Sequence, residues 1–181
     1  MAEVFLRRLS RWQADQQREA VADLYVDAYR GSADEQFHDR QEYLRLLGEH
    51  VQRPGFEMVI ASAAGRLAGS VYGFRADRTD TWWQGHEGGL PDEMAELTAA
   101  GRVFVMVELM VSPHFRQTRV ATRLQQQLLT RADSGLAVTL IDQENAPARH
   151  ALESWSWESL GKTPNPSGGP PLEAWTRRLP R

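Results

Sequence analysis

One stretch of nine residues constrains the fold more than any other part of the chain. Residues 103–111, VFVMVELMV, contain eight apolar residues and one charged residue, Glu108. Such a run, without alternation of apolar and polar residues, predicts a strand that is covered on both faces and is central in its sheet. The turn SPHFRQT follows, and Val120, Leu124 and Leu128 then recur at the spacing of the buried side of a helix.

A second buried strand, LAVTLI, is expected at 136–141. Together with the preceding helix it predicts a parallel strand–helix–strand unit at about 103–141 with a right-handed crossover. The other expected elements are a strand near 4–9, helices over 20–28 and from Asp39 to Val51, a hairpin from 56 with its turn at Gly65, a short helix within 91–101, a helix from Asn145 to near Gly161, and a last strand over 172–179. This order predicts an α/β (α+β) fold with helices on both faces of the sheet.

Composition excludes several classes of protein. A chain of 181 residues favours a single domain over 1–181, and a net charge of −3 with a pI near 6.0 argues against a nucleic-acid binder. No cysteine is present, which excludes disulfides and thiolate catalysis. No apolar run is long enough for a membrane helix, and the first residues lack an apolar signal core, so a cytoplasmic protein without a membrane partner is expected.

The five histidines, at positions 38, 50, 86, 114 and 150, show no metal-ligand spacing. They are assigned to the surface, and no metal is expected. Trp155, Trp157 and Trp175 are expected in the core or at a dimer face.

The segment ELMVSPHFRQTRVA resembles the signature of the GNAT acyltransferase superfamily, in which ELxV and a proline precede R/Q-x-x-G-x-G/A at the start of a helix. The matching residues are Glu108, Leu109, Val111, Pro113, Arg116, Val120 and Ala121. Downstream, NAPARHALESWSW keeps Asn145, Ala148 and Trp157 of a second family pattern. The resemblance covers nearly the whole chain and implies a mixed, mostly antiparallel central sheet.

The resemblance further implies transfer of an acetyl group from acetyl-CoA to an amine, with Glu108 as catalytic base. It implies cofactor contacts from Leu109, Met110, Val111, Arg116, Gln117, Thr118, Arg119, Val120, Ala121, Thr122 and Asn145. The chain departs from the family at three positions. Arg119 replaces the middle glycine, Leu152 replaces the tyrosine that protonates the departing thiolate, and Ser156 replaces the glycine of a GW pair.

The three arginines at 116, 119 and 123 leave two readings open. Spaced three and four apart, they are expected on neighbouring turns of the helix, where a bound anion would offset their unfavourable interaction with the helix dipole. Their side chains would then replace part of the backbone contact that glycine permits. The alternative is three solvated side chains that point away.

Two other features also have two readings. Glu108, alone in an apolar strand, is either a base with a raised pKa or a partner in a salt bridge to a neighbouring helix. Trp82 and Trp83 either form a pocket for a cationic amine with nearby acids or anchor their loop to the core.

The sequence therefore predicts an acetyl-CoA-dependent N-acyltransferase that acts on a primary amine of a small molecule or peptide by direct attack in a ternary complex. The alternative is a GNAT-fold protein with impaired catalysis and a binding or scaffold role, which need not bind coenzyme A. The acceptor pocket is expected within 23–50 and 75–102. Dimerisation through the C-terminal strand is left open.

Overall fold

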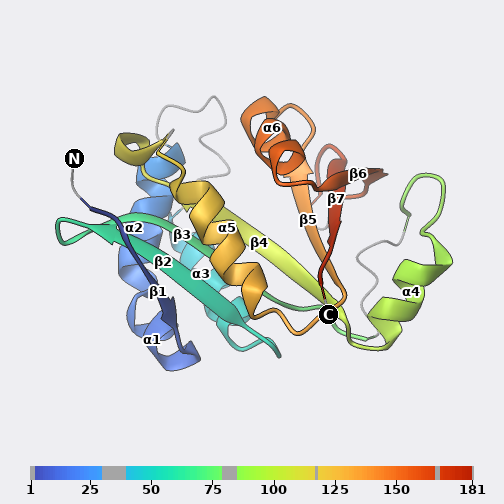
Figure 1. Cartoon of the computed structure of the whole chain (residues 1–181), viewed down its shortest axis with the longest axis horizontal. Helices are drawn as coiled ribbons and strands as arrows, with labels where there is room; N and C mark the ends of the chain where they lie inside the picture. The colour runs from blue at the N-terminus through green and yellow to red at the C-terminus, as the bar shows by residue number, and fades with distance from the viewer. Residues whose placement is uncertain (1–2, 30–39, 79–84, 117, 166–167, 181) are drawn as a thin grey trace. The chain divides into compact units, whose positions relative to one another are not determined.

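The computed structural model describes residues 3–29, 40–78, 85–116, 118–165 and 168–180 (Figure 1). The chain divides into two compact units, one of residues 1–74 and 108–132 and the other of residues 75–107 and 133–181. Strand β4, Val103–Val111, begins in the second unit and ends in the first. The expectation of a single domain stays a prediction.

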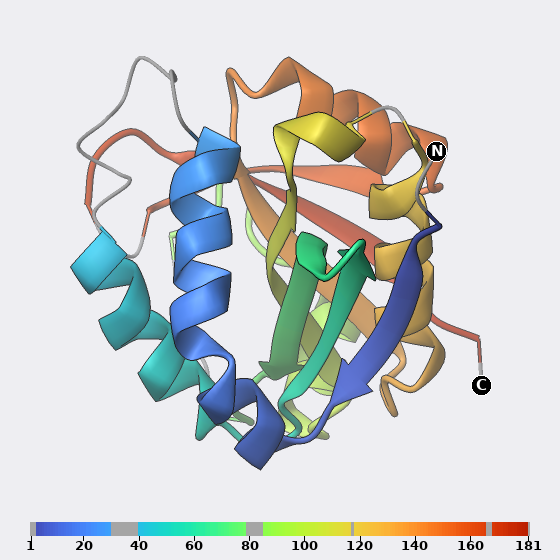
Figure 2. The same ribbon diagram turned by 90° about the vertical axis from the view of Figure 1, so that its left-hand side faces the viewer.

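The first unit is built on strands β1, β2, β3 and the last part of β4, in that order. β1 pairs antiparallel with β2, and β2 pairs antiparallel with β3. Helices α2 and α3 lie side by side on one face of these strands, and α5 covers the other face (Figure 2). The elements of this unit are β1 Phe5–Leu9, α1 Arg11–Gln16, α2 Arg18–Tyr29, α3 Arg40–Val51, β2 Glu57–Ala63, β3 Arg66–Arg75, the 3₁₀ turn η2 Pro113–Phe115 and α5 Val120–Thr130.

A glycine on β3 decides how closely α5 approaches the sheet. A Cβ at Gly69 would lie 2.7 Å from the carbonyl oxygen of Met110, 2.9 Å from Leu124 Cδ1 and 3.3 Å from Val120 Cγ1. Carbon atoms do not approach other heavy atoms this closely, so only glycine fits here without displacing β4 or α5. This position therefore fixes the distance between β3, the end of β4 and the first turns of α5.

The second unit contains α4 Asp92–Ala99, β5 Leu136–Asp142, α6 Ala146–Ser154, β6 Glu158–Thr163 and β7 Leu172–Arg178. β4 pairs in parallel with β5 from Val103↔Leu136 to Val105↔Val138, as the sequence predicted. β5 and β6 both pair antiparallel with β7. The predicted fold class, a mixed and mostly antiparallel sheet with helices on both faces, is confirmed.

The expected helix from Asn145 is shorter than predicted. It ends at Ser154, and Gly161 lies instead in β6, a strand that the sequence analysis missed. The N–H groups of Ser156 and Trp157 donate to the carbonyls of Glu153 and Leu152, which is the hydrogen-bond pattern of a Schellman motif. Ser156, which stands where the family has a glycine, has a φ of 65°. The helix ends there because the backbone turns left-handed at this residue.

Two assignments of side chains are also resolved. Trp157 and Trp175 are each 3% exposed, so both are core residues, whereas Trp155 is only partly buried. The surface assignment is wrong for His86, which is buried and whose Nε2 lies 2.9 Å from the carbonyl oxygen of Leu160. No helix in the described segments is long and apolar enough to cross a membrane, and no group of three metal-ligating side chains occurs among the described residues.

Candidate active site

Glu108 accepts a hydrogen bond from a neighbouring helix. It projects from β4, and the Tyr29 hydroxyl, on the last residue of α2, donates to Glu108 Oε1 at 2.5 Å. Within the described residues Glu108 makes no ion pair, so the predicted alternative of a salt bridge to a neighbouring helix is wrong. Its partner is a helix residue, but a neutral one.

The environment of Glu108 disfavours its charged form. Burial raises the pKa of Glu108 to about 7, and the hydrogen bond from Tyr29, which stabilises the carboxylate, opposes this shift. The negative charge of Glu108 in turn raises the pKa of Tyr29 far above its ordinary value. At neutral pH the carboxyl group is therefore divided between its acid and base forms while Tyr29 stays protonated, which suits Glu108 for accepting and returning a proton.

All four tyrosines of the chain lie close enough to this carboxylate for its charge to raise their pKa values. The rings of Tyr25 and Tyr29 lie 4.9 Å apart, and Tyr25 stacks on Tyr43 at 4.1 Å and 15°. Burial, followed by the charge of Glu108, raises the pKa of Tyr25 to about 12. Burial likewise raises the pKa values of Tyr43 and Tyr72, with Glu108 a further cause in each case. We call these four residues the tyrosine cluster.

His50 extends the tyrosine cluster toward solvent. Its Nδ1 lies 2.8 Å from the Tyr72 hydroxyl, and its ring packs 5.0 Å from that of Phe74. Burial and the nearby charge of Arg53 lower the pKa of His50 to about 4, so the imidazole is neutral at physiological pH. This histidine is only partly exposed, because α3 turns it toward the sheet.

The start of α5 presents free backbone donors. Arg119 is the N-cap residue, and no side chain caps the helix. The first N–H groups of a helix have no intrahelical partner, and together with the helix dipole they attract anions. Arg119 has φ 65° and ψ 13°, the left-handed conformation that glycine adopts without strain. Its side chain is exposed and makes no hydrogen bond or ion pair to the described residues.

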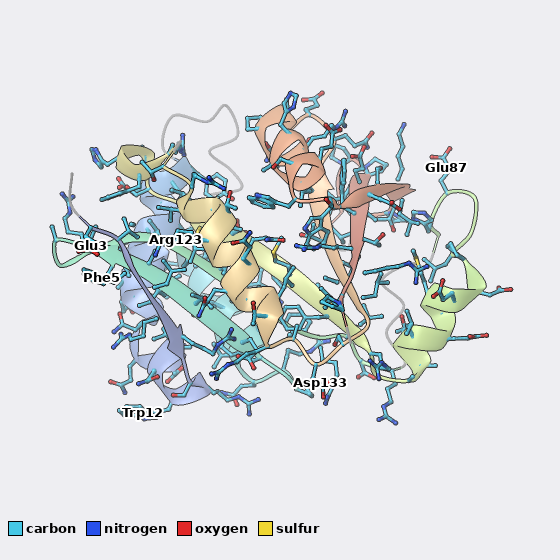
Figure 3. All side chains as sticks on the ribbon, viewed as in Figure 1. Glu3, Phe5, Trp12, Glu87, Arg123 and Asp133 are labelled. Atoms are coloured by element: carbon cyan, nitrogen blue, oxygen red, sulfur yellow. The ribbon has the colours of Figure 1, made fainter. Side chains whose placement is uncertain are left out.

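The three arginines do not lie on neighbouring turns of one helix, contrary to the prediction. α5 begins only at Val120, so Arg116 and Arg119 precede its first turn. Arg116 donates to the carbonyl of Ala28 near the end of α2. Arg123 lies on α5 beside the start of β1 (Figure 3) and donates to the carbonyl of Val4 at 3.3 Å. Of the three guanidinium groups, that of Arg119 remains available to an anion.

The other expected cofactor residues fall into three groups. Leu109, Met110 and Val111 form the end of β4, with Met110 only 2% exposed. Thr118 is exposed and donates to the carbonyl of Phe115, whereas Val120, Ala121 and Thr122 form the first turn of α5. Asn145 lies in the second unit, where its Oδ1 accepts from the Ala148 N–H at 3.1 Å and caps α6 as predicted.

The remaining expected residues lie in the second unit or outside the described residues. Leu152 is a buried residue of α6 in the second unit, 3% exposed. Gln117, Trp82 and Trp83 lie outside the described residues, so the prediction of a tryptophan pocket stays a prediction. The acceptor region expected at 23–50 supplies Tyr25, Tyr29, Tyr43 and His50.

A separate open hollow of about 560 Å³ lies in the first unit between the start of β1 and α5. Its lining residues are Glu3, Val4, Phe5, Leu6, Arg123, Gln126, Gln127 and Thr130. None of them belongs to the tyrosine cluster. This hollow is therefore distinct from the surroundings of Glu108.

Sequence reasoning missed the tyrosine cluster and His50, although a local signal was present. Tyr25 and Tyr29 are four residues apart, as are positions on one helix face, and Tyr43 and His50 are seven apart. Both pairs therefore face one direction on α2 and α3. The sequence analysis placed Tyr25 and Tyr43 within two predicted helices and gave neither of them a role at the site.

Comparisons with known proteins place the chain in a family. A model of the acetyltransferase (GNAT) family matches residues 18–156. No curated protein matches the sequence. A solved acetyltransferase of the GNAT family from Staphylococcus aureus Mu50 superimposes with a TM-score of 0.65 at 11% identity, covering 98% of this chain and 100% of the other.

Two further solved structures share the fold. A protein from Pyrococcus horikoshii OT3 gives a TM-score of 0.70 at 14% identity, with 99% of this chain and 100% of the other covered. An aminoglycoside 6′-acetyltransferase type Ii gives a TM-score of 0.66 at 15% identity, with 98% of this chain and 99% of the other covered. The family match spans well over half of the chain, and the strand order, Glu108 and the uncapped start of α5 agree with it. The chain belongs to the GNAT acetyltransferase family.

Proposed function

We propose that the chain is an acetyl-CoA-dependent N-acyltransferase that acts on a primary amine of a small molecule or peptide by direct attack in a ternary complex. The observation that carries this proposal is Glu108, a partly buried carboxyl group with a pKa of about 7, three residues before the end of an otherwise apolar strand. A base with this pKa is matched to removing a proton from an ammonium group near neutral pH.

In the proposed reaction, Glu108 accepts a proton from the ammonium group of the acceptor, directly or through water. The neutral amine then attacks the thioester carbonyl, the C–N bond forms, the C–S bond breaks, and the second proton of the amine passes through solvent to the departing thiolate. The main chain of Leu109, Met110 and Val111 pairs with the pantetheine arm. A backbone N–H of β4 polarises the thioester carbonyl, and donors of this kind commonly make the largest single contribution to such reactions.

The diphosphate is assigned to the start of α5. The N–H groups of Val120, Ala121 and Thr122 supply hydrogen bonds, and the free guanidinium of Arg119 supplies a positive charge. Since Leu152 offers no proton to the departing thiolate, the thiolate leaves with help from solvent, and turnover is expected to be slower than with a tyrosine at that position.

A thermal-shift titration with acetyl-CoA tests this function. At 100 times its dissociation constant the ligand is expected to add about 2.7 kcal/mol to the free energy of unfolding. For a chain of this length, that corresponds to a rise in Tm of roughly 5–10 °C. Pantetheine, which lacks the diphosphate, serves as the control and is expected to give a much smaller shift.

No shift at millimolar acetyl-CoA would contradict the proposal. It would leave the alternative, a GNAT-fold protein with a binding or scaffold role. Binding of acetyl-CoA without transfer to any of a panel of amines, followed as release of the free thiol, would support impaired catalysis instead.

Replacing Arg119 by glycine is expected to have two effects of opposite sign. Relief of the left-handed backbone should stabilise the free protein by roughly 1–2 kcal/mol. Loss of a charge-assisted hydrogen bond should weaken acetyl-CoA binding by about tenfold or more. Calorimetric titration measures the affinity, and thermal unfolding without ligand measures the stability.

Ala64→Gly is the matched control, because Ala64 has a φ of 52° in the exposed turn between β2 and β3. This control should gain stability and leave the affinity unchanged. A tighter complex in Arg119→Gly would show that Arg119 obstructs the diphosphate, and an unchanged affinity would show that its side chain is not a ligand.

A further inference from the structure

The hydrogen bond between Tyr29 and Glu108 joins two elements that are far apart in the sequence. Tyr29 is the last residue of α2, and Glu108 lies on β4, 79 residues further along. The Tyr29 hydroxyl donates to Oε1 at 2.5 Å. Within the described residues Oε2 of Glu108 has no hydrogen-bond partner, so Tyr29 holds one of the two carboxylate oxygens.

Tyr29 is itself held in place from two sides. Its ring lies 4.9 Å from Tyr25, which stacks on Tyr43 of α3. The guanidinium of Arg116 donates to the carbonyl of Ala28, one residue before Tyr29. The last carbonyls of a helix lack intrahelical partners and favour a cation, so this contact stabilises the end of α2. The end of a helix, which ordinarily frays, is here fixed against the catalytic strand.

The other titratable groups around Glu108 do not replace this contact. They are Tyr25 on α2, Tyr43 and His50 on α3, Tyr72 on β3, and Arg116 in the turn after β4. His50 is bonded to Tyr72, Arg116 is bonded to Ala28, and the Tyr43 hydroxyl is buried without a partner. Tyr29 is the group among the described residues that donates a hydrogen bond to the carboxylate.

We infer that Tyr29 is a positioning residue for Glu108: its hydroxyl fixes Oε1, favours the carboxylate form, and leaves Oε2 to take the proton of the acceptor amine. This inference rests on the proposed role of Glu108 as base. A hydrogen bond to the charged form of an acid favours that form, so its removal must shift the titration of Glu108 to higher pH.

The direct test follows the titration of Glu108 by NMR in protein labelled with ¹³C at the glutamate carboxyl groups, with Glu108→Gln identifying the resonance. In Tyr29→Phe, which keeps the ring and its packing, the midpoint is expected to rise by roughly one pH unit or more. A midpoint that stays in place or falls would overturn the inference. No turnover is needed, so the result stands even if the proposed activity fails.

Tyr43→Phe is the matched control. It removes the same atom from the same cluster, but this hydroxyl has no hydrogen-bond partner in the described part of the chain, so the midpoint of Glu108 should stay close to that of the wild type. A shift as large as that of Tyr29→Phe would overturn the inference, because it would show a general effect of losing a buried hydroxyl.

Site-specific 3-fluorotyrosine at position 29 gives a second variant that keeps the shape of the side chain. Fluorination makes the phenol a stronger hydrogen-bond donor, so the Glu108 midpoint should fall below that of the wild type. Shifts of opposite sign in the two variants cannot arise from loosened packing. A rise with fluorotyrosine would contradict the inference even if Tyr29→Phe folds poorly.

Where transfer to an amine is measurable, the pH dependence of kcat/KM gives a further readout. Tyr29→Phe should lose roughly fivefold or more at pH 7, because most of its Glu108 is protonated there, and should recover most of that loss near pH 9. A loss that is equal at both pH values would mean that Tyr29 acts through structure alone.

Discussion

Glu108→Gln is expected to lower kcat/KM at pH 7 by roughly 100- to 10 000-fold, the usual contribution of a positioned general base. Glutamine keeps the size of the side chain but cannot accept the proton. In the wild type the rate should rise as pH increases through about 7, where the carboxylate forms. This acid limb should be absent from the variant. The measurement is the pH–rate profile of thiol release with an accepted amine.

Glu57→Gln is a suitable control, because Glu57 pairs with Arg8 at 2.7 Å on β2 and is not part of the tyrosine cluster. Its profile should keep the acid limb. Full wild-type rate and profile in Glu108→Gln would exclude Glu108 as the base.

The same variant should be more stable than the wild type at pH 8. The pKa of Glu108 is about 7 in the folded chain and near 4.5 as the ordinary value, so between these values the folded state binds more protons than the unfolded state. Stability therefore falls as pH rises through this window, by roughly 3 kcal/mol in all. Glutamine does not ionise and avoids this loss. Below pH 4 the two proteins should differ little, and thermal unfolding at pH 4 and pH 8 measures the difference.

Gly69→Val is expected to have the largest effect on stability, a loss of roughly 3 kcal/mol or more. The new side chain meets the backbone oxygen of Met110 at 2.7 Å and the Leu124 side chain at 2.9 Å. Leu124 can rotate, but the backbone of β4 cannot move without disturbing its neighbours. For a chain of this length the Tm should fall by roughly 6–12 °C. Denaturant unfolding gives the change in free energy.

Arg66→Val places the same side chain at an exposed position of β3 and should change stability little. Adding Leu124→Ala to Gly69→Val relieves one contact and leaves the other. A return to the stability of the single Leu124→Ala variant would therefore show that the side chain, not the β4 backbone, sets the limit at this position.

The strand–turn–helix unit shows why part of the fold can be predicted from local sequence. Eight apolar residues in nine mark β4, and the spacing of Val120, Leu124 and Leu128 marks α5. Hydrophobic periodicity reports which face of an element is buried, and this information lies within one segment. β6 was missed because ESLGKT carries little of that signal, being exposed or partly buried over most of its length.

At two positions the backbone keeps a left-handed conformation although a residue other than glycine stands there. Arg119 and Ser156 stand where the family has glycine, and both have a φ of 65°. The resemblance therefore identified the positions at which the backbone turns left-handed. It did not indicate that the conformation persists when a side chain is present. The conformation persists because the packing of the fold compensates for a strain of roughly 1–2 kcal/mol.

The sequence by itself determined the order of most elements, the parallel pairing of β4 with β5, and Glu108 as the one charge of a buried strand. Only the tertiary structure decided what surrounds that charge. Tyr29 lies 79 residues from Glu108, and Arg116 lies 88 residues from Ala28. Contacts over such separations depend on how α2, α3 and the strands pack, and no periodicity within one element encodes them. The same packing removes water from Glu108 and so sets its pKa.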